Sequence, residues 1–251
     1  MLVSAYRGHG KRVAVLAVDP SSPFSGGALL GDRVRMQEHA TDRDVFIRSM
    51  ASRGHLGGLS AAAPQAIRVL DAAGFDVILV ETVGVGQAEV EIASEADSTV
   101  VMLAPGMGDA IQAAKAGILE VADVFVVNKA DRDGADEAVR ELRYMLSLGE
   151  RNTDRWKPPI VKTVASKGEG ADEVVAALQK HREWLESAGE LEHRRRARAA
   201  DEIEALAVTM LRERMGDLRG GTTLERLAGR VAAGELDPYA AADELVAGIT
   251  T

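Results

Sequence analysis

Short apolar runs alternate with amphipathic stretches over the first three quarters of the chain. The runs are rich in β-branched residues and bounded by turn-forming residues, which predicts buried strands. They occupy Arg12–Val18, Val45–Met50, Val77–Val80, Thr99–Leu103, Val124–Val127 and Ile160–Val164. Helical spacing of apolar residues occupies Leu30–His39, Pro64–Ala73, Ala135–Leu148 and Asp172–Leu185. This alternation predicts an α/β fold with a mostly parallel sheet flanked by helices, and ligand sites in the loops that follow the strands.

The pattern changes after about Glu190, where no further strand is predicted. Apolar residues there form three helical stripes, at Ile203 to Leu211, Leu224 to Val231 and Tyr239 to Val246. We therefore predict an α/β domain at 1–189 and an all-helical C-terminal extension at 190–251. The apolar faces of this extension either pack on the α/β domain or form a dimer.

Composition narrows the class of protein. The 251 residues suffice for one sizeable domain with an extension, and the absence of cysteine excludes disulfides and thiolate metal or redox sites. A net charge of −9 argues against a nucleic-acid partner, which requires a basic surface. No apolar run approaches the roughly 20 residues of a membrane span, and the first residues lack the features of a secretory signal. We expect a cytoplasmic protein without a membrane partner.

The segment VVNKADRDG (126–134) contains an Asn-Lys-x-Asp pattern where a predicted strand ends. Asp131 can accept two hydrogen bonds from the N–H edge of guanine, whereas adenine presents an unsuitable pattern. Asn128 can reach acceptor atoms of the base and tie neighbouring loops together, and the stem of Lys129 can cover the ring. Hydrogen bonds to a charged group contribute about 1.5–3 kcal/mol each. The pattern therefore predicts guanine binding, with a chance tetrapeptide in a charged turn as the alternative.

The segment TVASKGEG (163–170) follows the next predicted strand. Ser166 and Lys167 occupy the place where guanine-binding folds offer a backbone N–H to the base oxygen. Alone this is an ordinary Ser/Gly loop. Next to an Asn-Lys-x-Asp pattern one strand earlier, it predicts the second half of a guanine site.

The segment VILVETVGVGQAEVE (77–91) is an apolar strand that ends at Glu81 and runs into a Gly-x-Gly turn. A carboxylate at a strand tip can hold Mg²⁺ directly or through water. Gly84 would let a backbone N–H approach a γ-phosphate, so the turn with Gly84, Gly86 and Gln87 is a candidate phosphate sensor. The alternative is a strand–turn–helix with a capping carboxylate.

The segment VDPSSPFSGGALLGDR (18–33) offers two more carboxylates, Asp19 at a strand tip and Asp32 beyond it. Such a pair could order a metal ion and an attacking water near an incoming phosphate. Turn-forming aspartates are the alternative. The five histidines have no metal-ligand spacing and are expected to be surface or packing residues: His9, His39, His55, His181 and His193.

Together these segments identify a resemblance. The chain resembles the MeaB/ArgK family of P-loop GTPases, auxiliary proteins of adenosylcobalamin-dependent methylmalonyl-CoA mutase. The likeness runs along the chain in AVDPSSPFSGGALLGDRVRM, RSMASRGHLGGLS, ETVGVGQAEVE, LAPGMGDAIQAAKAG, VVNKAD and DPYAAADEL.

The resemblance implies roles for particular residues. Asp19, Asp32 and Glu81 match acidic residues of the Mg²⁺ and catalytic region. Asn128, Lys129, Asp131 and Ser166 match the guanine site, and Ala104–Lys115 resembles a switch segment whose lysine couples partner binding to hydrolysis. The extension would form a homodimer arm. The Asp-x-His-x-x-Gly motif for cobalamin is absent, so adenosylcobalamin is expected on a mutase partner and GTP or GDP with Mg²⁺ on this chain.

The family's phosphate loop has no match here. No Gly-x-x-x-x-Gly-Lys-Ser/Thr occurs, and Gly10-Lys11 precedes a predicted strand instead of following one. Leu2–Gly8 resembles the end of the helix that should follow the loop, stopped at Gly8-His9-Gly10. We therefore expect a truncated chain that lacks a first strand inside the sheet and the Walker A loop. Such a chain would bind GTP poorly, hydrolyse it negligibly and tend to aggregate.

Three other functions are weighed against the GTPase chaperone. A kinase for a small amine or a transport protein would transfer phosphate to its substrate and not to water. A nickel metallochaperone would need Cys or His ligands, which this sequence does not offer at suitable spacing. A non-catalytic dimeric binding module would bind a mutase without GTP turnover.

Overall fold

The computed structural model describes residues 1–20, 36–52, 62–82, 95–106, 119–148, 156–215 and 222–247. Contacts divide the chain into two compact units, Met1–Arg195 and Arg196–Thr251. The first unit holds all the described strands, and the second is helical. The sequence places a domain boundary between 189 and 190, and that assignment stays a prediction.

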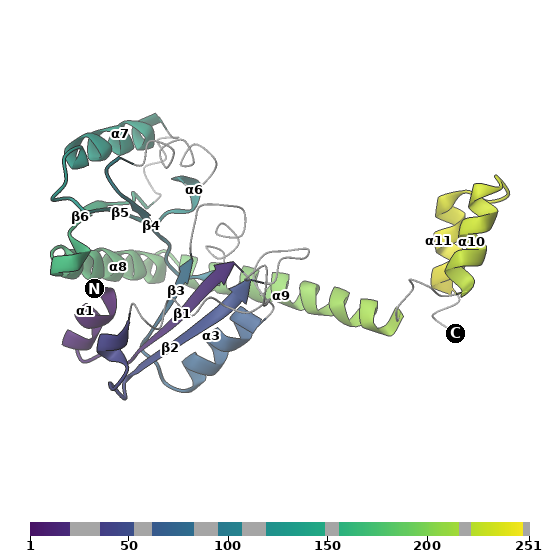
Figure 1. Cartoon of the computed structure of the whole chain (residues 1–251), viewed down its shortest axis with the longest axis horizontal. Helices are drawn as coiled ribbons and strands as arrows, with labels where there is room; N and C mark the ends of the chain where they lie inside the picture. Colours follow the sequence, from purple (N-terminus) through teal and green to yellow (C-terminus); the bar gives the residue numbers. More distant parts are fainter. Residues whose placement is uncertain are drawn as a thin grey trace. The chain divides into compact units, whose positions relative to one another are not determined.

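The first sheet has β1 (Val13–Pro20) at its centre, between β2 (Val45–Ser52) and β3 (Val77–Thr82), with both neighbours parallel to it (Figure 1). Residues 13 to 17 of β1 are at most 2% exposed, as expected for a central strand covered on both faces. On one face Ala14 and Leu16 pack against α3 (Ala62–Ala72). On the other, Val13 and Val15 pack against α1 (Leu2–Gly8).

The second sheet has β5 (Val124–Asn128) at its centre, between β4 (Val100–Leu103) and β6 (Ile160–Thr163), again all parallel. Phe125 packs against Leu142 of α7 (Ala135–Leu148) on one face. Val124 and Val126 pack against Val174 of α8 (Ala171–Ser187) on the other. Parallel strands with helices on both faces place all three C-terminal strand ends at one edge.

Helix α1 contributes to the cores of both sheets. Leu2 packs with the cluster of Val124, Val126 and Val174, whereas Val3 packs with Val13 and Val15. The guanidinium of Arg7, on the same helix, bonds Asp42 at 2.8 Å and Asp44 at 3.1 Å, both just before β2. One short helix therefore links the two halves of the first unit.

The predicted α/β class is confirmed, and each of the six predicted strands is present. The predicted helix end at Gly8 is also confirmed, with Gly10 at a φ of 71° just beyond it. Most of the predicted helix Leu30–His39 lies outside the described residues, and its end is a 3₁₀ turn, η1 (Gln37–His39). Among the described residues no ladder joins β3 to β4, so the strands form two three-stranded sheets where one was expected.

The predicted helical extension is confirmed. It comprises α9 (Glu190–Met215), α10 (Thr222–Ala232) and α11 (Pro238–Ala247). Leu227 of α10 and Ala241 of α11 are buried, and Glu244 pairs with Arg226 and Arg230 at 3.1 and 2.9 Å. The described helices are all too short or too polar to span a bilayer.

Candidate functional site

Asn128, the last residue of β5, ties two loops together. It lies in register with Thr163 at the end of β6. Its side-chain oxygen accepts a hydrogen bond from the backbone N–H of Ala165 at 3.0 Å and another from the Thr163 hydroxyl at 3.2 Å. Because the oxygen already accepts two bonds, the NH₂ group is the part of this side chain that can serve a ligand.

The next residue, Lys129, is held in a strained backbone conformation. Its φ of 57° makes it the one non-glycine residue with positive φ in the described ranges. That conformation costs a residue with a side chain about 1–2 kcal/mol. Two backbone bonds at 3.0 Å hold it: Ala130 N–H to the Thr163 carbonyl and Arg132 N–H to the Lys129 carbonyl. Such strain is typical of loops that position functional groups.

Asp131 completes the pattern and faces the loop after β6. Its carboxylate lies 3.5 Å from the Lys167 ammonium, with the two side chains 43% and 56% exposed. An ion pair this exposed adds little stability and exchanges readily with other partners. The carboxylate is therefore available to a ligand with N–H donors.

The loop after β6 is a tight turn. It contains η3 (Ala165–Lys167) and closes with a bridge between Val164 and Glu169. The Lys167 N–H donates to the Val164 carbonyl at 2.9 Å. Of the two predicted residues, Ser166 is therefore the better candidate to donate its N–H to a base oxygen.

Gly170 closes this loop and begins α8. Its φ is +81°, and a Cβ there would lie 2.9 Å from the Thr163 methyl carbon and would also meet the Lys162 carbonyl oxygen. Only glycine fits this position. Gly170 thus fixes the distance between the loop and the end of β6.

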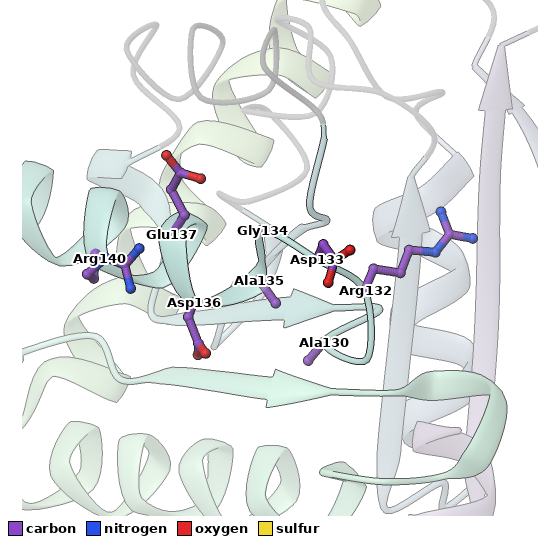
Figure 2. Close-up of a pocket in the computed structure, with 8 residues that line it drawn as sticks. All are labelled: Ala130, Arg132, Asp133, Gly134, Ala135, Asp136, Glu137 and Arg140. Atoms are coloured by element: carbon purple, nitrogen blue, oxygen red, sulfur yellow. The ribbon is translucent and has the colours of Figure 1, made fainter.

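Two hollows flank these loops. Figure 2 shows the first, of about 280 Å³, formed by one continuous stretch that runs from the turn after β5 into α7. It is lined by Ala130, Arg132, Asp133, Gly134, Ala135, Asp136, Glu137 and Arg140, so it excludes Asn128 and Asp131. The second, of about 350 Å³, is lined by Ser166 and by residues of α1, η1 and the start of α8. We assign the base to neither hollow.

In the first sheet, two of the predicted acidic residues lie near the C-terminal strand ends. Asp19 is the penultimate residue of β1, and Glu81 on β3 is in register with Ala17, two residues before Asp19. The Glu81 Oε2 atom is buried and has no hydrogen-bond partner in the part of the chain that the structure describes. A carboxylate oxygen left in this way fits a hard cation such as Mg²⁺. The described residues contain no cluster of three or more potential metal ligands.

Several predicted site residues lie outside the described residues, namely Asp32, Gly84, Gly86, Gln87 and Lys115. The residues predicted to bind guanine belong to the second sheet, and Glu81 and Asp19 belong to the first. Their convergence on one nucleotide stays a prediction. Sequence reasoning missed two residues that shape the loops after β5 and β6, Thr163 and Gly170. The glycine spacing in SKGEG is a signal for the second, whereas Thr163 has no signal beyond its place at a strand end.

A second polar cluster lies at the opposite, N-terminal edge of the same sheet. Asp123, just before β5, accepts the Thr99 N–H at 2.8 Å and lies 3.2 Å from the Nε2 atom of His181. That contact is short but poorly aligned for a hydrogen bond. The other ring nitrogen, Nδ1, lies 2.7 Å from the Ser98 hydroxyl. Arg194 at the start of α9 lies 3.4 Å from the same carboxylate.

This cluster contains serine, histidine and aspartate but is built as a core. His181 is fully buried and packs between Trp156 and Trp184, at ring distances of 4.9 and 5.9 Å. Burial would raise the pKa of Asp123, but contacts with His181, the Thr99 N–H and Arg194 outweigh it and leave that pKa lowered. The expectation that the histidines are packing or surface residues is confirmed for His181, and we assign this cluster a structural role.

Comparison with known proteins relates this chain to a family of GTPases. The sequence profile of the family described as "Methylmalonyl Co-A mutase-associated GTPase MeaB" matches residues 1–218. A Pyrococcus horikoshii protein provisionally named as a GTPase is 48% identical over 244 residues, covering 96% of this chain and 76% of that protein. Escherichia coli GTPase ArgK is 40% identical over 195 residues, covering 76% of this chain and 59% of ArgK.

A solved structure shares the fold. The crystal structure of an LAO/AO transport system kinase superposes with a TM-score of 0.69 at 27% identity, covering all of this chain and 76% of that one. The family match and the two relatives establish the family, and the solved structure shares the fold. The chain belongs to the MeaB/ArgK family of P-loop GTPases.

Proposed function

We propose that this chain recognises the guanine base of GTP and belongs to a GTP-hydrolysing chaperone. The chaperone assists or protects an adenosylcobalamin-dependent acyl-CoA mutase. The observation that carries guanine recognition is the Asn128 side chain, whose oxygen bonds both Ala165 and Thr163 of the second loop. These bonds fix the two loops against each other without a ligand. Groups ordered in advance lose less entropy on binding, which favours affinity.

The polar groups of these loops match the edge of guanine. Asp131 would accept the ring N–H and the exocyclic amino group on its two oxygens, and Ser166 would donate its N–H to the base carbonyl. The NH₂ group of Asn128 would donate to the five-membered ring nitrogen. Adenine offers an acceptor where Asp131 needs a donor, so the carboxylate would lose its partners. Lys167, now 3.5 Å from Asp131, would give way to the base.

We further propose that Asp19, Asp32 and Glu81 hold Mg²⁺ near the phosphates. The unpartnered Oε2 of Glu81 supports a role in binding a hard cation. When bound, the ion would neutralise charge on the phosphate oxygens. The turn with Gly84, Gly86 and Gln87 is proposed to sense the γ-phosphate, because Gly84 would let a backbone N–H approach it. Lys115 is proposed, from the resemblance, to help couple partner binding to hydrolysis.

Affinity for the phosphates is proposed to be low in these 251 residues. The sequence has no Gly-x-x-x-x-Gly-Lys-Ser/Thr segment, whose N–H groups and lysine would hold the β- and γ-phosphates. Base contacts alone would have to retain a highly charged ligand. Titration calorimetry measures this directly, and tight GTP binding by the chain would contradict it.

The mutase role rests on the family, whose description names methylmalonyl-CoA mutase. We propose that the nucleotide state selects the conformation that contacts the mutase, and that the cobalamin stays on the mutase. The test measures how much mutase is retained on the immobilised chain in the presence of GDP and in the presence of a non-hydrolysable GTP analogue. Transfer of the γ-phosphate to an amine or a transport protein would favour a kinase instead.

The helical extension is proposed to form a homodimer. Apolar side chains of α9 are exposed in the single chain, including Ile203 at 68% and Leu211 at 58%. Exposed apolar groups that repeat along a helix favour a partner helix. Light scattering that gives the mass of one chain at high concentration would contradict this assignment.

The sharpest test of base recognition is Asp131→Asn. The amide offers a donor where guanine also has a donor, so guanine affinity should fall by roughly 100-fold. A xanthine nucleotide has a carbonyl at that position, so it should bind the variant better than it binds the wild type. Competition of GDP and XDP against a fluorescent guanine nucleotide measures both changes.

The matched control is Asp133→Asn, which removes a carboxylate two residues further along the same exposed turn. It should leave both affinities within about twofold of the wild type, because surface charges contribute little. Equal loss of guanine affinity in both variants, with no gain for xanthine, would show that Asp131 does not contact the base.

A further inference from the structure

One face of the first sheet is built in rows across its three strands. Residues in register on neighbouring parallel strands point to the same face. The first row is Val45, Val13 and Val77, and the second is Ile47, Val15 and Leu79. Val13 and Val15 pack with Val3 and Tyr6 of α1 and with Met36. These two rows are wholly apolar, as a covered face requires.

The third row breaks this pattern. Its members are Ser49 on β2, Ala17 on β1 and Glu81 on β3, in register with one another. A hydroxyl and a carboxylate thus stand where the preceding rows carry Ile and Leu. The small Ala17, 1% exposed, lies between them. The change from apolar to polar occurs two residues before Asp19, near the C-terminal strand ends where ligands bind in such sheets.

Both polar residues of this row carry a buried atom without a partner. Ser49 Oγ and Glu81 Oε2 are inaccessible to solvent, and neither has a hydrogen-bond partner within the described residues. Burying a polar atom without a hydrogen bond destabilises a fold. Two such atoms in one row suit a ligand that reaches both.

Spacing decides what kind of ligand fits. Neighbouring strands lie about 4.8 Å apart, so Ser49 and Glu81, one strand to either side of Ala17, are about 10 Å apart at their Cα atoms. The side chains are too short for a direct hydrogen bond over that span. A hydrated divalent cation is long enough to bridge it, because Mg²⁺ keeps most of its waters and these bond to hydroxyl and carboxylate oxygens.

We propose that Ser49 is a positioning residue of the metal site, holding the water shell of the divalent cation opposite Glu81. This inference rests on the proposed function, since the cation is the one that accompanies the nucleotide. Ser49 contributes no charge. Its hydroxyl orients a metal-bound water across Ala17, so that Glu81 and Ser49 fix the ion from both sides of β1.

The test uses Mn²⁺ as the probe, because bound and free Mn²⁺ are distinguished by electron paramagnetic resonance. Mn²⁺ is titrated into the 251-residue chain and its Ser49→Ala variant, each with and without GDP. Ser49→Ala should raise the half-saturating Mn²⁺ concentration about fivefold to tenfold, the effect of losing one hydrogen bond. Its melting temperature in metal-free buffer should stay equal or rise, because an unpartnered hydroxyl is removed.

Two variants control this comparison. Ser49→Thr keeps the hydroxyl and suits a strand, so it should bind Mn²⁺ like the wild type. Ser147→Ala removes an exposed hydroxyl on α7 that bonds the Tyr144 carbonyl, and it should change nothing. If Ser49→Ala does not fold, Ser49→Thr and Ser49→Val form an isosteric pair that differs only in the hydroxyl.

Unchanged Mn²⁺ binding in Ser49→Ala overturns the inference. A lower metal-free melting temperature with unchanged Mn²⁺ binding does so too, since the hydroxyl would then hold only a structural water. Guanine preference is measured separately in the wild type. If that preference is present while Ser49→Ala binds Mn²⁺ normally, this inference alone fails, whereas its absence removes the proposed function as well.

Discussion

The two edges of the second sheet carry polar clusters that are built in opposite ways. At the N-terminal edge, the Asp123 carboxylate is surrounded by His181, Arg194 and the Thr99 N–H, and two tryptophans cover the histidine. At the C-terminal edge, Asp131 pairs with the exposed Lys167. The same sheet thus buries one aspartate among its partners and leaves another half exposed.

The difference teaches how polar residues divide between structure and function in this domain. A buried charge is stable only when nearby groups compensate it fully, and such a cluster has no capacity left for a ligand. An exposed carboxylate on a loop fixed by other bonds keeps that capacity. Backbone strain is found at the same edge as the exposed carboxylate, because Lys129, with its positive φ, lies at the C-terminal edge.

The largest expected effect is at the N-terminal edge of the second sheet. Asp123→Ala should lower the free energy of unfolding by about 3–5 kcal/mol, because it leaves buried His181 and the Arg194 charge without their partner. Urea unfolding followed by tryptophan fluorescence measures this, since both tryptophans of the chain, Trp156 and Trp184, pack at His181. Asp136→Ala, which breaks an exposed pair with Lys162, is the control and should change little. Equal effects would remove the contrast between buried and exposed aspartates.

The next effect concerns the backbone at the C-terminal edge of the second sheet. Gly170→Ala should cost about 2–4 kcal/mol, from an unfavourable φ and a clash with residues 162 and 163. Gly168→Ala, with a similar φ of +76° but open space around its Cβ, isolates the first contribution and should cost about 1–2 kcal/mol. Thermal or urea unfolding compares the two. A Gly170→Ala variant no less stable than Gly168→Ala would show that the contact with β6 is unimportant.

A smaller effect is expected at Asn128. Asn128→Ala removes the acceptor for Thr163 and Ala165, so the two loops lose their connection and guanine affinity should fall roughly tenfold. Thr163→Val removes one donor and leaves the Ala165 bond intact, and it should change affinity much less. Fluorescent GDP titration measures both variants. A larger loss of affinity in Thr163→Val than in Asn128→Ala would show that Asn128 does not hold the two loops together.

The smallest effect is the dependence of stability on acid pH that arises from Asp123 at the N-terminal edge. The pKa of Asp123 is lowered from its ordinary value of 3.8 in the folded chain. Its contribution to stability is therefore complete above that value and is lost as the pH falls through the lower folded pKa. Unfolding free energies measured between about pH 5 and pH 2 should converge for the wild type and Asp123→Asn. A constant difference over that range would contradict the lowered pKa.

Sequence reasoning predicted the strands correctly because they depend on local signals, and the predicted guanine site after β5 and β6 rests on local signals too. β1 and β5 are continuous apolar runs, and the Asn-Lys-x-Asp pattern is four adjacent residues after one of them. The chemistry of a short segment determines such features. Ser166 is a weaker case, since its role depends on the neighbouring loop.

What escaped prediction depends on residues far apart in the chain. Asp123, His181 and Arg194 come together from three elements, and no periodicity joins them. The row of Ser49, Ala17 and Glu81 exists only once the register of three strands is known. The division into two sheets is likewise a matter of hydrogen bonds between strands, which apolar patterns do not specify.

Helix α1 has a mechanical consequence. Its adjacent residues Leu2 and Val3 are committed to different cores, so the helix cannot turn about its own axis without disturbing the packing of both. Its first residues also border Ser166 across a hollow. A movement of the loop after β6 that narrows this hollow would therefore press on a helix whose packing also supports β1.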